Sequence, residues 1–164
     1  MERQDELLMP IKEEFAIAIL AGWKRYEIRK RWFGFPPGTQ IWLYATKTSR
    51  GGTGAVLGSF IAGDCLPIEG ARELRAFAKE SAVTQRGLRA YLGGYRGWAI
   101  KVASYQELKE PLATTQPLRM YRRLTNSSGD RKLRRLLDAA DKYQQRQPIS
   151  ATALASRSTR SAAR

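Results

Sequence analysis

Short apolar segments separated by glycine- and proline-containing turns run through the first 125 residues, and they restrict the fold more than any other feature. Several segments have the length and residue types of β-strands, and a few show helical spacing. Short strands with few helices favour an α+β fold built on a small β-barrel over a parallel sheet. The expected strands are residues 7–12, 25–31, 40–46, 55–62 and 97–102, and the expected helices are 13–21, 71–80 and 84–92.

The charge balance indicates a polyanionic partner. The sequence contains 29 Lys and Arg residues and 15 Asp and Glu residues, which gives a net charge of +14. Such an excess favours a nucleic acid first and an acidic membrane surface second. A basic, solvated surface or a ribosome-associated extension would explain the same charge without a specific site.

Several classes of chemistry are excluded by residues that the sequence lacks. Cys65 is the only cysteine and there is no histidine, so an internal disulfide, a zinc site and Ser-His-Asp or Cys-His catalysis are not expected. No apolar run of about 18 residues predicts a transmembrane helix, and the charged start does not resemble a signal peptide. We therefore expect a cytoplasmic protein without a metal or a cofactor.

The composition changes near Asn126 and divides the chain into a domain and a basic tail. Residues 1–125 hold 20 basic and 12 acidic residues, whereas residues 126–164 hold nine and three, a net charge of +6. Apolar residues at helical spacing predict a basic helix at about 129–145. It would either pack on the main domain or contact nucleic acid directly. After Pro148 the Ser/Ala/Thr/Arg-rich sequence predicts disorder.

The segment from Gly22 to Arg31 has the clearest potential for chemistry. It leaves a predicted helix and enters a strand whose alternation places Glu27, Arg29 and Arg31 on one face. The two arginines are suited to phosphate, and Glu27 is suited to accept a hydrogen bond from a base amine. Lys24 lies at the junction, where it can reach into a cleft. The alternative is an exposed strand with alternating charges that form salt bridges.

Aromatic residues are interleaved with these basic residues. This arrangement suits stacking on unpaired bases beside a groove that follows the phosphate backbone. Trp23 and Trp32 are the stacking candidates. The aromatic residues expected in the core are Tyr26, Trp42, Phe60 and Trp98.

The residues of this segment resemble a known family. The run from Met9 to Arg29 ends its first strand in Ile-Lys and then contains Gly-x-Lys-x-x-Glu-x-Arg, as ASCH domains do. Segments 41–46, 55–60, 91–100 and 111–122 continue the likeness in order, over about 115 residues. The residues on the pattern are Lys12, Gly22, Lys24, Glu27 and Arg29.

The resemblance implies a PUA-like β-barrel with a cleft that binds RNA or a nucleotide. Lys12, Lys24, Glu27 and Arg29 would line this cleft. Tyr121 and Arg122 would close it or end the barrel. Some ASCH proteins are amidohydrolases that deacylate modified cytidine nucleosides with a lysine, a threonine and a glutamate. Others are described as ribonucleases.

We therefore expect a binding module for RNA or a nucleotide, with DNA as a further possible partner and no membrane. The alternative is an amidohydrolase on acylated cytidine nucleosides or a ribonuclease, with Lys24 and Glu27 as catalytic residues. Glu27 stands where the amidohydrolases carry threonine. A third interpretation is an interaction protein whose cleft has lost its role.

Overall fold

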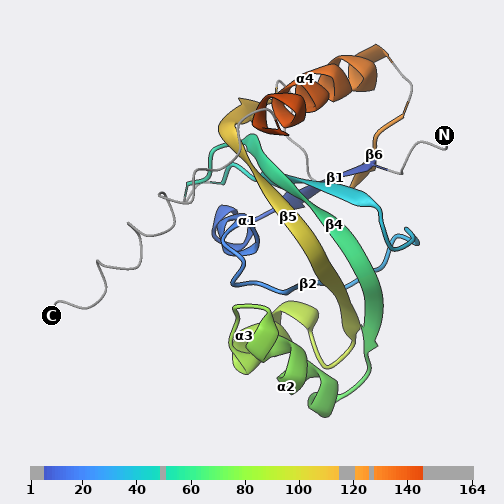
Figure 1. Ribbon diagram of the computed structural model, residues 1–164. Coiled ribbons are helices and arrows are strands. Elements are labelled where there is room, and N and C mark those ends of the chain that lie inside the picture. The colour runs from blue at the N-terminus through green and yellow to red at the C-terminus, as the bar shows by residue number, and fades with distance from the viewer. Residues whose placement is uncertain (1–5, 49–50, 115–120, 126–127, 146–164) are drawn as a thin grey trace, which may run out of the picture.

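The computed structural model describes residues 6–48, 51–114, 121–125 and 128–145 (Figure 1). The tail for which the sequence predicts disorder lies outside these residues. The strands are β1 (Glu6–Ile11), β2 (Tyr26–Arg29), β3 (Gln40–Ala45), β4 (Ala55–Ile68), β5 (Gly97–Ala113) and β6 (Arg122–Arg123). The helices are α1 (Glu13–Leu20), α2 (Ala71–Glu80), α3 (Gln85–Leu92) and α4 (Ser128–Gln145).

The six strands form one mixed sheet in the order β2-β5-β4-β3-β1-β6. Strands β1 and β3 pair in parallel, and the remaining neighbours are antiparallel. The expected α+β class is confirmed. The sheet does not close into a full barrel, because in the described ranges no pairing joins the edge strands β2 and β6. These edges have four and two residues, too few to form a continuous seam.

Strands β4 and β5 are much longer than the sequence indicates. They have 14 and 17 residues and form a long ribbon that crosses the molecule (Figure 1). Their pairing shifts register at three places, between Val56/Gly58, Ile61/Ala62 and Ala62/Cys65. A β-bulge interrupts the alternation of apolar and polar residues and bends the strand. This interruption hides the full length of both strands from a search for alternating residues.

Three apolar clusters hold helices against the bent sheet. The first surrounds α1 and includes Phe60, the second lies beneath α4 and includes Trp42, and the third joins α2 and α3 to the far end of the ribbon. Trp42 and Phe60 are buried, as the sequence predicts. Tyr26 and Trp98 are only partly buried.

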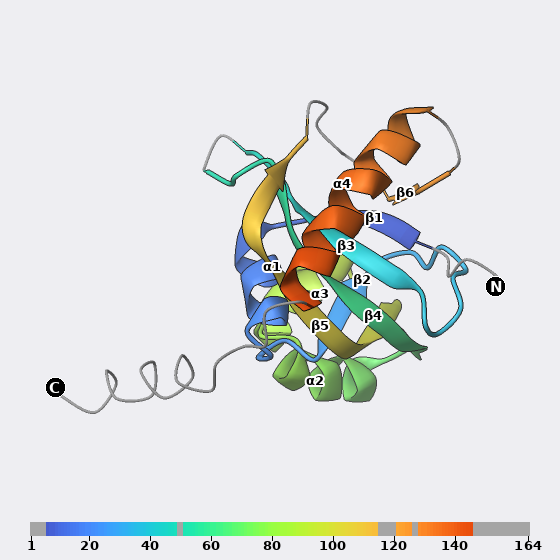
Figure 2. The ribbon, with the colours of Figure 1, turned by 45° about the horizontal axis from the view of Figure 1, so that its top comes forward.

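Helix α4 packs on the sheet (Figure 2). Leu137 is buried in the cluster beneath it. The Arg134 Nε atom lies 2.8 Å from Glu6 Oε2 on β1. Asp130 accepts a hydrogen bond of 2.7 Å from the Thr125 hydroxyl. The expected basic helix is therefore present, and its exposed cations include Arg131, Lys132 and Arg135.

None of the helices in the described parts of the chain is both long enough and apolar enough to cross a membrane.

The packing of α4 predicts a contrast between two adjacent leucines. Leu137→Ala removes a buried side chain and should lower the free energy of unfolding by about 2–5 kcal/mol. Leu136→Ala truncates an exposed side chain and should change it by less than about 0.5 kcal/mol. Urea unfolding of both variants measures the difference. Equal losses would contradict this orientation of α4.

Candidate functional site

A cleft of about 610 Å³ lies between the end of β1, helix α1, strand β2 and helix α3. Residues from four separate parts of the chain line it, at 10–15, 24–29, 46 and 82–91, so the sheet and the helices build it together. The polar and aromatic residues on its walls are Lys12, Glu14, Phe15, Lys24, Glu27, Arg29, Thr46, Thr84 and Tyr91.

A carboxylate between two cations forms the floor of this cleft. Glu27 Oε1 lies 2.9 Å from Arg29 Nε, and Glu27 Oε2 lies 3.4 Å from Lys24 Nζ. Lys24 and Glu27 are only 3% and 4% exposed. The sequence places Glu27 on the charged face of its strand. In the structure this face is buried at Glu27. A buried charge requires an oppositely charged group close by, and Glu27 is that group for both Lys24 and Arg29.

The turn at Gly22 directs Lys24 into the cleft. Gly22 has φ +79°, a left-handed conformation in which a side chain would also collide with Tyr105. Beyond this turn the main-chain N–H of Lys24 donates to the Ala18 carbonyl, and its ammonium donates to the Ser81 carbonyl at 2.8 Å. The backbone conformation thus requires the glycine of the sequence motif.

Besides its contact with Glu27, Arg29 is held by Pro10 and Tyr121. Its Nη2 atom donates to the Pro10 carbonyl at 2.7 Å, which ties β2 to β1. The guanidinium also lies 5.0 Å from the centre of the Tyr121 ring. Phe33 packs on the same ring at 4.3 Å. Arg29 is therefore a preorganised cation, because little freedom remains for it to lose on binding.

Burial and the central carboxylate determine the protonation of the cluster. Burial lowers the pKa of Lys24, and Arg29 adds to this, whereas Glu27 opposes it. Burial also acts to lower the pKa of Arg29. The charge of Glu27, together with Tyr121 and Tyr91, has the larger effect, so the pKa of Arg29 is raised. Burial raises the pKa of both Tyr91 and Tyr121. Lys24 is therefore the cation of this cluster that gives up its proton more readily.

Of the residues proposed from the sequence, four meet at the cleft and four do not. Lys12, Lys24, Glu27 and Arg29 line it. Lys12 is exposed at its edge, with Nζ 6.0 Å from the Phe15 ring centre. The four that are not on its walls are Trp23, Arg31, Trp32 and Arg122.

Each of these four residues has another environment. Trp23 is 77% exposed, and Arg31 is also exposed. Trp32 lies against Trp98 with a ring separation of 5.3 Å. Arg122 is paired with Asp130 at 2.8 Å, at the start of α4.

Five polar or aromatic wall residues were not proposed from the sequence, and two of them, Glu14 and Phe15, belong to α1. Tyr91 comes from α3, Thr46 follows β3, and Thr84 begins α3, where its hydroxyl accepts from the Gly87 N–H at 3.0 Å. Thr46, Thr84 and Tyr91 all lie 15 or more residues from the motif segment 22–31. Thr84 shows a helix-start pattern, but such a pattern does not indicate a cleft.

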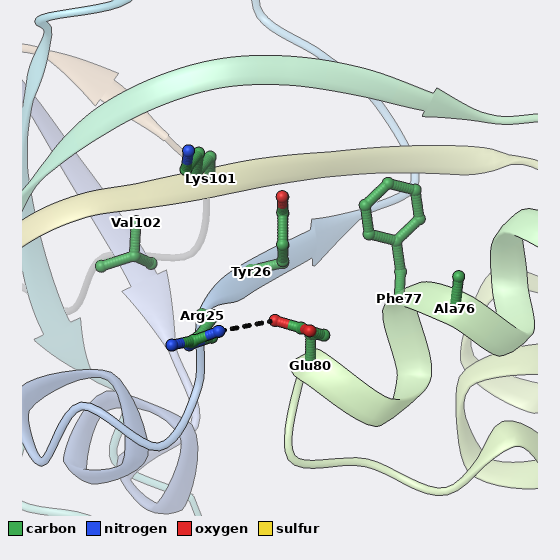
Figure 3. A pocket seen from close by; sticks show the side chains of 7 residues that line it. All are labelled: Arg25, Tyr26, Ala76, Phe77, Glu80, Lys101 and Val102. Carbon is green, nitrogen blue, oxygen red and sulfur yellow. Dashed lines mark ion pairs between the residues drawn. The ribbon is translucent and has the colours of Figure 1, made fainter.

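A second pocket of about 610 Å³ lies on the other side of β2, between α2 and β5 (Figure 3). Its walls include the ion pair of Arg25 with Glu80, 3.5 Å apart and exposed on both sides. An exposed pair of this kind contributes little and is screened by salt. Unlike the cleft, this pocket is not lined by a buried ionised group, so the cleft is the better candidate site.

In the ranges that the structure describes, no group of three or more His, Cys, Asp and Glu side chains is arranged to hold a metal ion. The cleft instead offers fixed positive charge, the carboxylates of Glu14 and Glu27, two threonine hydroxyls and aromatic rings. These groups are suited to hydrogen-bond and stack a polar, partly aromatic ligand that carries negative charge.

The open mixed sheet and the flanking helices define a small α+β domain that carries this cleft. No known family model matches the sequence, and no curated protein matches it. Among solved structures, the ASCH protein from Zymomonas mobilis is similar, with 21% identity and a TM-score of 0.66 over 81% of this chain and 94% of that chain.

Two mutant forms of the same Zymomonas mobilis protein agree with this. The first is 22% identical, with a TM-score of 0.65 over 80% of this chain and 95% of that chain. The second is 20% identical, with a TM-score of 0.65 over 79% of this chain and 96% of that chain. The chain therefore has the fold of an ASCH domain. The resemblance found in the sequence is confirmed at the level of the fold.

The cluster predicts how the pKa of Lys24 responds to its neighbour. NMR titration of ¹³C-labelled lysines should give Lys24 a pKa below 10.5, and the signal is assigned by its loss in Lys24→Arg. Glu27→Gln should lower this pKa further, because it removes the charge that favours the ammonium form. The protein unfolded in urea is the reference. A pKa that rises in Glu27→Gln would contradict this description of the cluster.

Proposed function

We propose that this protein binds RNA or a nucleotide by holding one nucleoside unit in the cleft. The observation that carries the proposal is the buried Lys24–Glu27–Arg29 cluster on the floor of a cleft of about 610 Å³. This volume lies in the range of small-ligand sites, roughly 300–1,000 Å³. The net charge of +14 supports a polyanion as the natural ligand.

The cluster offers a base edge and a phosphate different partners. Each Glu27 oxygen faces one cation, and a carboxylate oxygen has a further lone pair to accept from an exocyclic amine. Lys12 is exposed at the edge, where an ammonium suits a phosphate. Phe15 and Tyr91 present rings on the walls beside these groups, which is suited to base stacking.

Lys24 supports a second candidate, hydrolysis of an acylated cytidine nucleoside or of RNA. A lysine acts as a base or a nucleophile only when neutral. Its lowered pKa and the Glu27 oxygen 3.4 Å away are the properties that such a role requires. Against it, Glu27 favours the charged ammonium and stands where the ASCH amidohydrolases carry threonine. We place binding first for this reason.

We also propose the cytoplasm as the compartment, because the one cysteine of the sequence is a free thiol, Cys65. Burial raises the pKa of this thiol to about 11, which keeps it protonated and unreactive at neutral pH. A reducing environment suits such a protein.

Binding is tested by fluorescence titration with the four mononucleotides and with single-stranded RNA and DNA of eight nucleotides. Glu27→Gln should change the preference among bases by about 1–3 kcal/mol, because it replaces an acceptor with a donor. Lys24→Ala should weaken binding and Lys24→Arg should retain more of it. Lys101→Ala is the control, since this lysine is exposed and outside the cleft. If neither Glu27→Gln nor Lys24→Ala differs from this control, the cleft is not the binding site.

Catalysis is tested in the same samples, with acylated cytidine and RNA followed by chromatography. The binding proposal predicts no turnover. If the wild type does turn over a substrate, the rate should rise with pH through the lowered pKa of Lys24, because the neutral amine is the active form. Turnover that disappears in Lys24→Arg would establish the second candidate in place of the first.

A further inference from the structure

Two stretches beside the cleft are basic and contain no acidic residue. No Asp or Glu lies between Glu27 and Asp64, or between Glu80 and Glu107. The chain brings these stretches together, because β2 pairs with β5 and places Arg29 opposite Trp98. These two stretches therefore contribute cations and no carboxylate to the surface that they share.

Three aromatic contacts lie where these stretches meet. Trp32 lies 5.3 Å from Trp98, measured between ring centres. Lys30 Nζ lies 5.3 Å from the Tyr91 ring centre, and the Arg89 guanidinium lies 4.7 Å from that of Tyr95. We refer to this group as the aromatic-cation surface; its members are Lys30, Trp32, Arg89, Tyr91, Tyr95 and Trp98.

The rings of this surface are accessible to a ligand. Trp32 is 42% exposed, Tyr91 44% and Tyr95 37%, and Trp98 is partly buried beneath Trp32. Large rings held in place by a neighbour and bordered by cations are suited to stack on bases while the cations contact phosphates. An apolar partner protein would leave these cations without compensating charge.

The aromatic-cation surface continues directly from the cleft. Tyr91 lines the cleft and also contacts Lys30. Arg29 lies on the cleft floor, and the next residue along the chain, Lys30, belongs to the surface. A chain of nucleotides with one member in the cleft would therefore pass over Tyr91 toward Trp32.

We infer that the protein binds a single-stranded nucleic acid, with one nucleotide in the cleft and its neighbours stacked on the aromatic-cation surface. This rests on the proposed function, which it extends from a nucleoside unit to a strand. Two observations carry it: the exposed paired rings, and the cations in stretches without acidic residues.

The experiment compares one mononucleotide, the best of the four, with a single-stranded RNA of eight nucleotides. Trp32→Ala should weaken RNA binding by about tenfold, because it removes one stacking platform, and should leave mononucleotide binding unchanged. Trp32→Phe should restore most of the loss. Arg89→Ala should reduce the dependence of log affinity on log salt by about 0.7, and Arg75→Ala, an exposed arginine on α2, should not. Circular dichroism verifies that each variant is folded.

The outcomes separate the two proposals. Equal affinity of the wild type and Trp32→Ala for the RNA would overturn the inference, while losses in Glu27→Gln would leave the cleft proposal intact. Weaker RNA binding in Trp32→Ala with no effect of Glu27→Gln or Lys24→Ala on either ligand would reject the cleft and support the surface. A polyglutamate peptide tests the alternative of an acidic protein segment. If it displaces the RNA, and Trp32→Ala weakens peptide binding as much as RNA binding, an acidic protein segment is the ligand and the inference is overturned.

Discussion

The buried Glu27 carboxylate between Lys24 and Arg29 is the interaction on which the arrangement of the cleft depends. An ion without a partner in such a position would cost several kcal/mol, so each of the three groups requires the other two. Through Arg29 the cluster reaches β1 at the Pro10 carbonyl, and through Lys24 it reaches the end of α2 at the Ser81 carbonyl. The same cluster thus stabilises the fold around the cleft and gives the cleft its charge.

The long β4–β5 ribbon is the framework that brings these parts within reach. Its bulges bend it, so that α4 packs over one end and α2 with α3 pack over the other. Because α2 and α3 connect the two strands, the position of the ribbon also determines where Tyr91 lies relative to β2. The wall of the cleft and the aromatic-cation surface both follow from this geometry.

Burial changes the chemical meaning of the motif residues. On an exposed strand, Lys24, Glu27 and Arg29 would form weak, screened ion pairs. In the cleft they are preorganised, and the pKa of Lys24 is lowered while that of Arg29 is raised. Recognition of a charged, hydrogen-bonding ligand benefits from groups that are already ordered.

The sequence by itself determined the α+β class, most element positions and four wall residues, because local periodicity, turn residues and the motif from Gly22 to Arg29 report local structure. Tertiary structure alone decided that Glu27 points inward, that the sheet stays open, and that Tyr91, Thr46 and Thr84 share a cleft with it. Alternation separates the two faces of a strand but does not show which face is covered. That depends on contacts between residues far apart in the chain, such as Arg29 with Pro10 and Lys24 with Ser81.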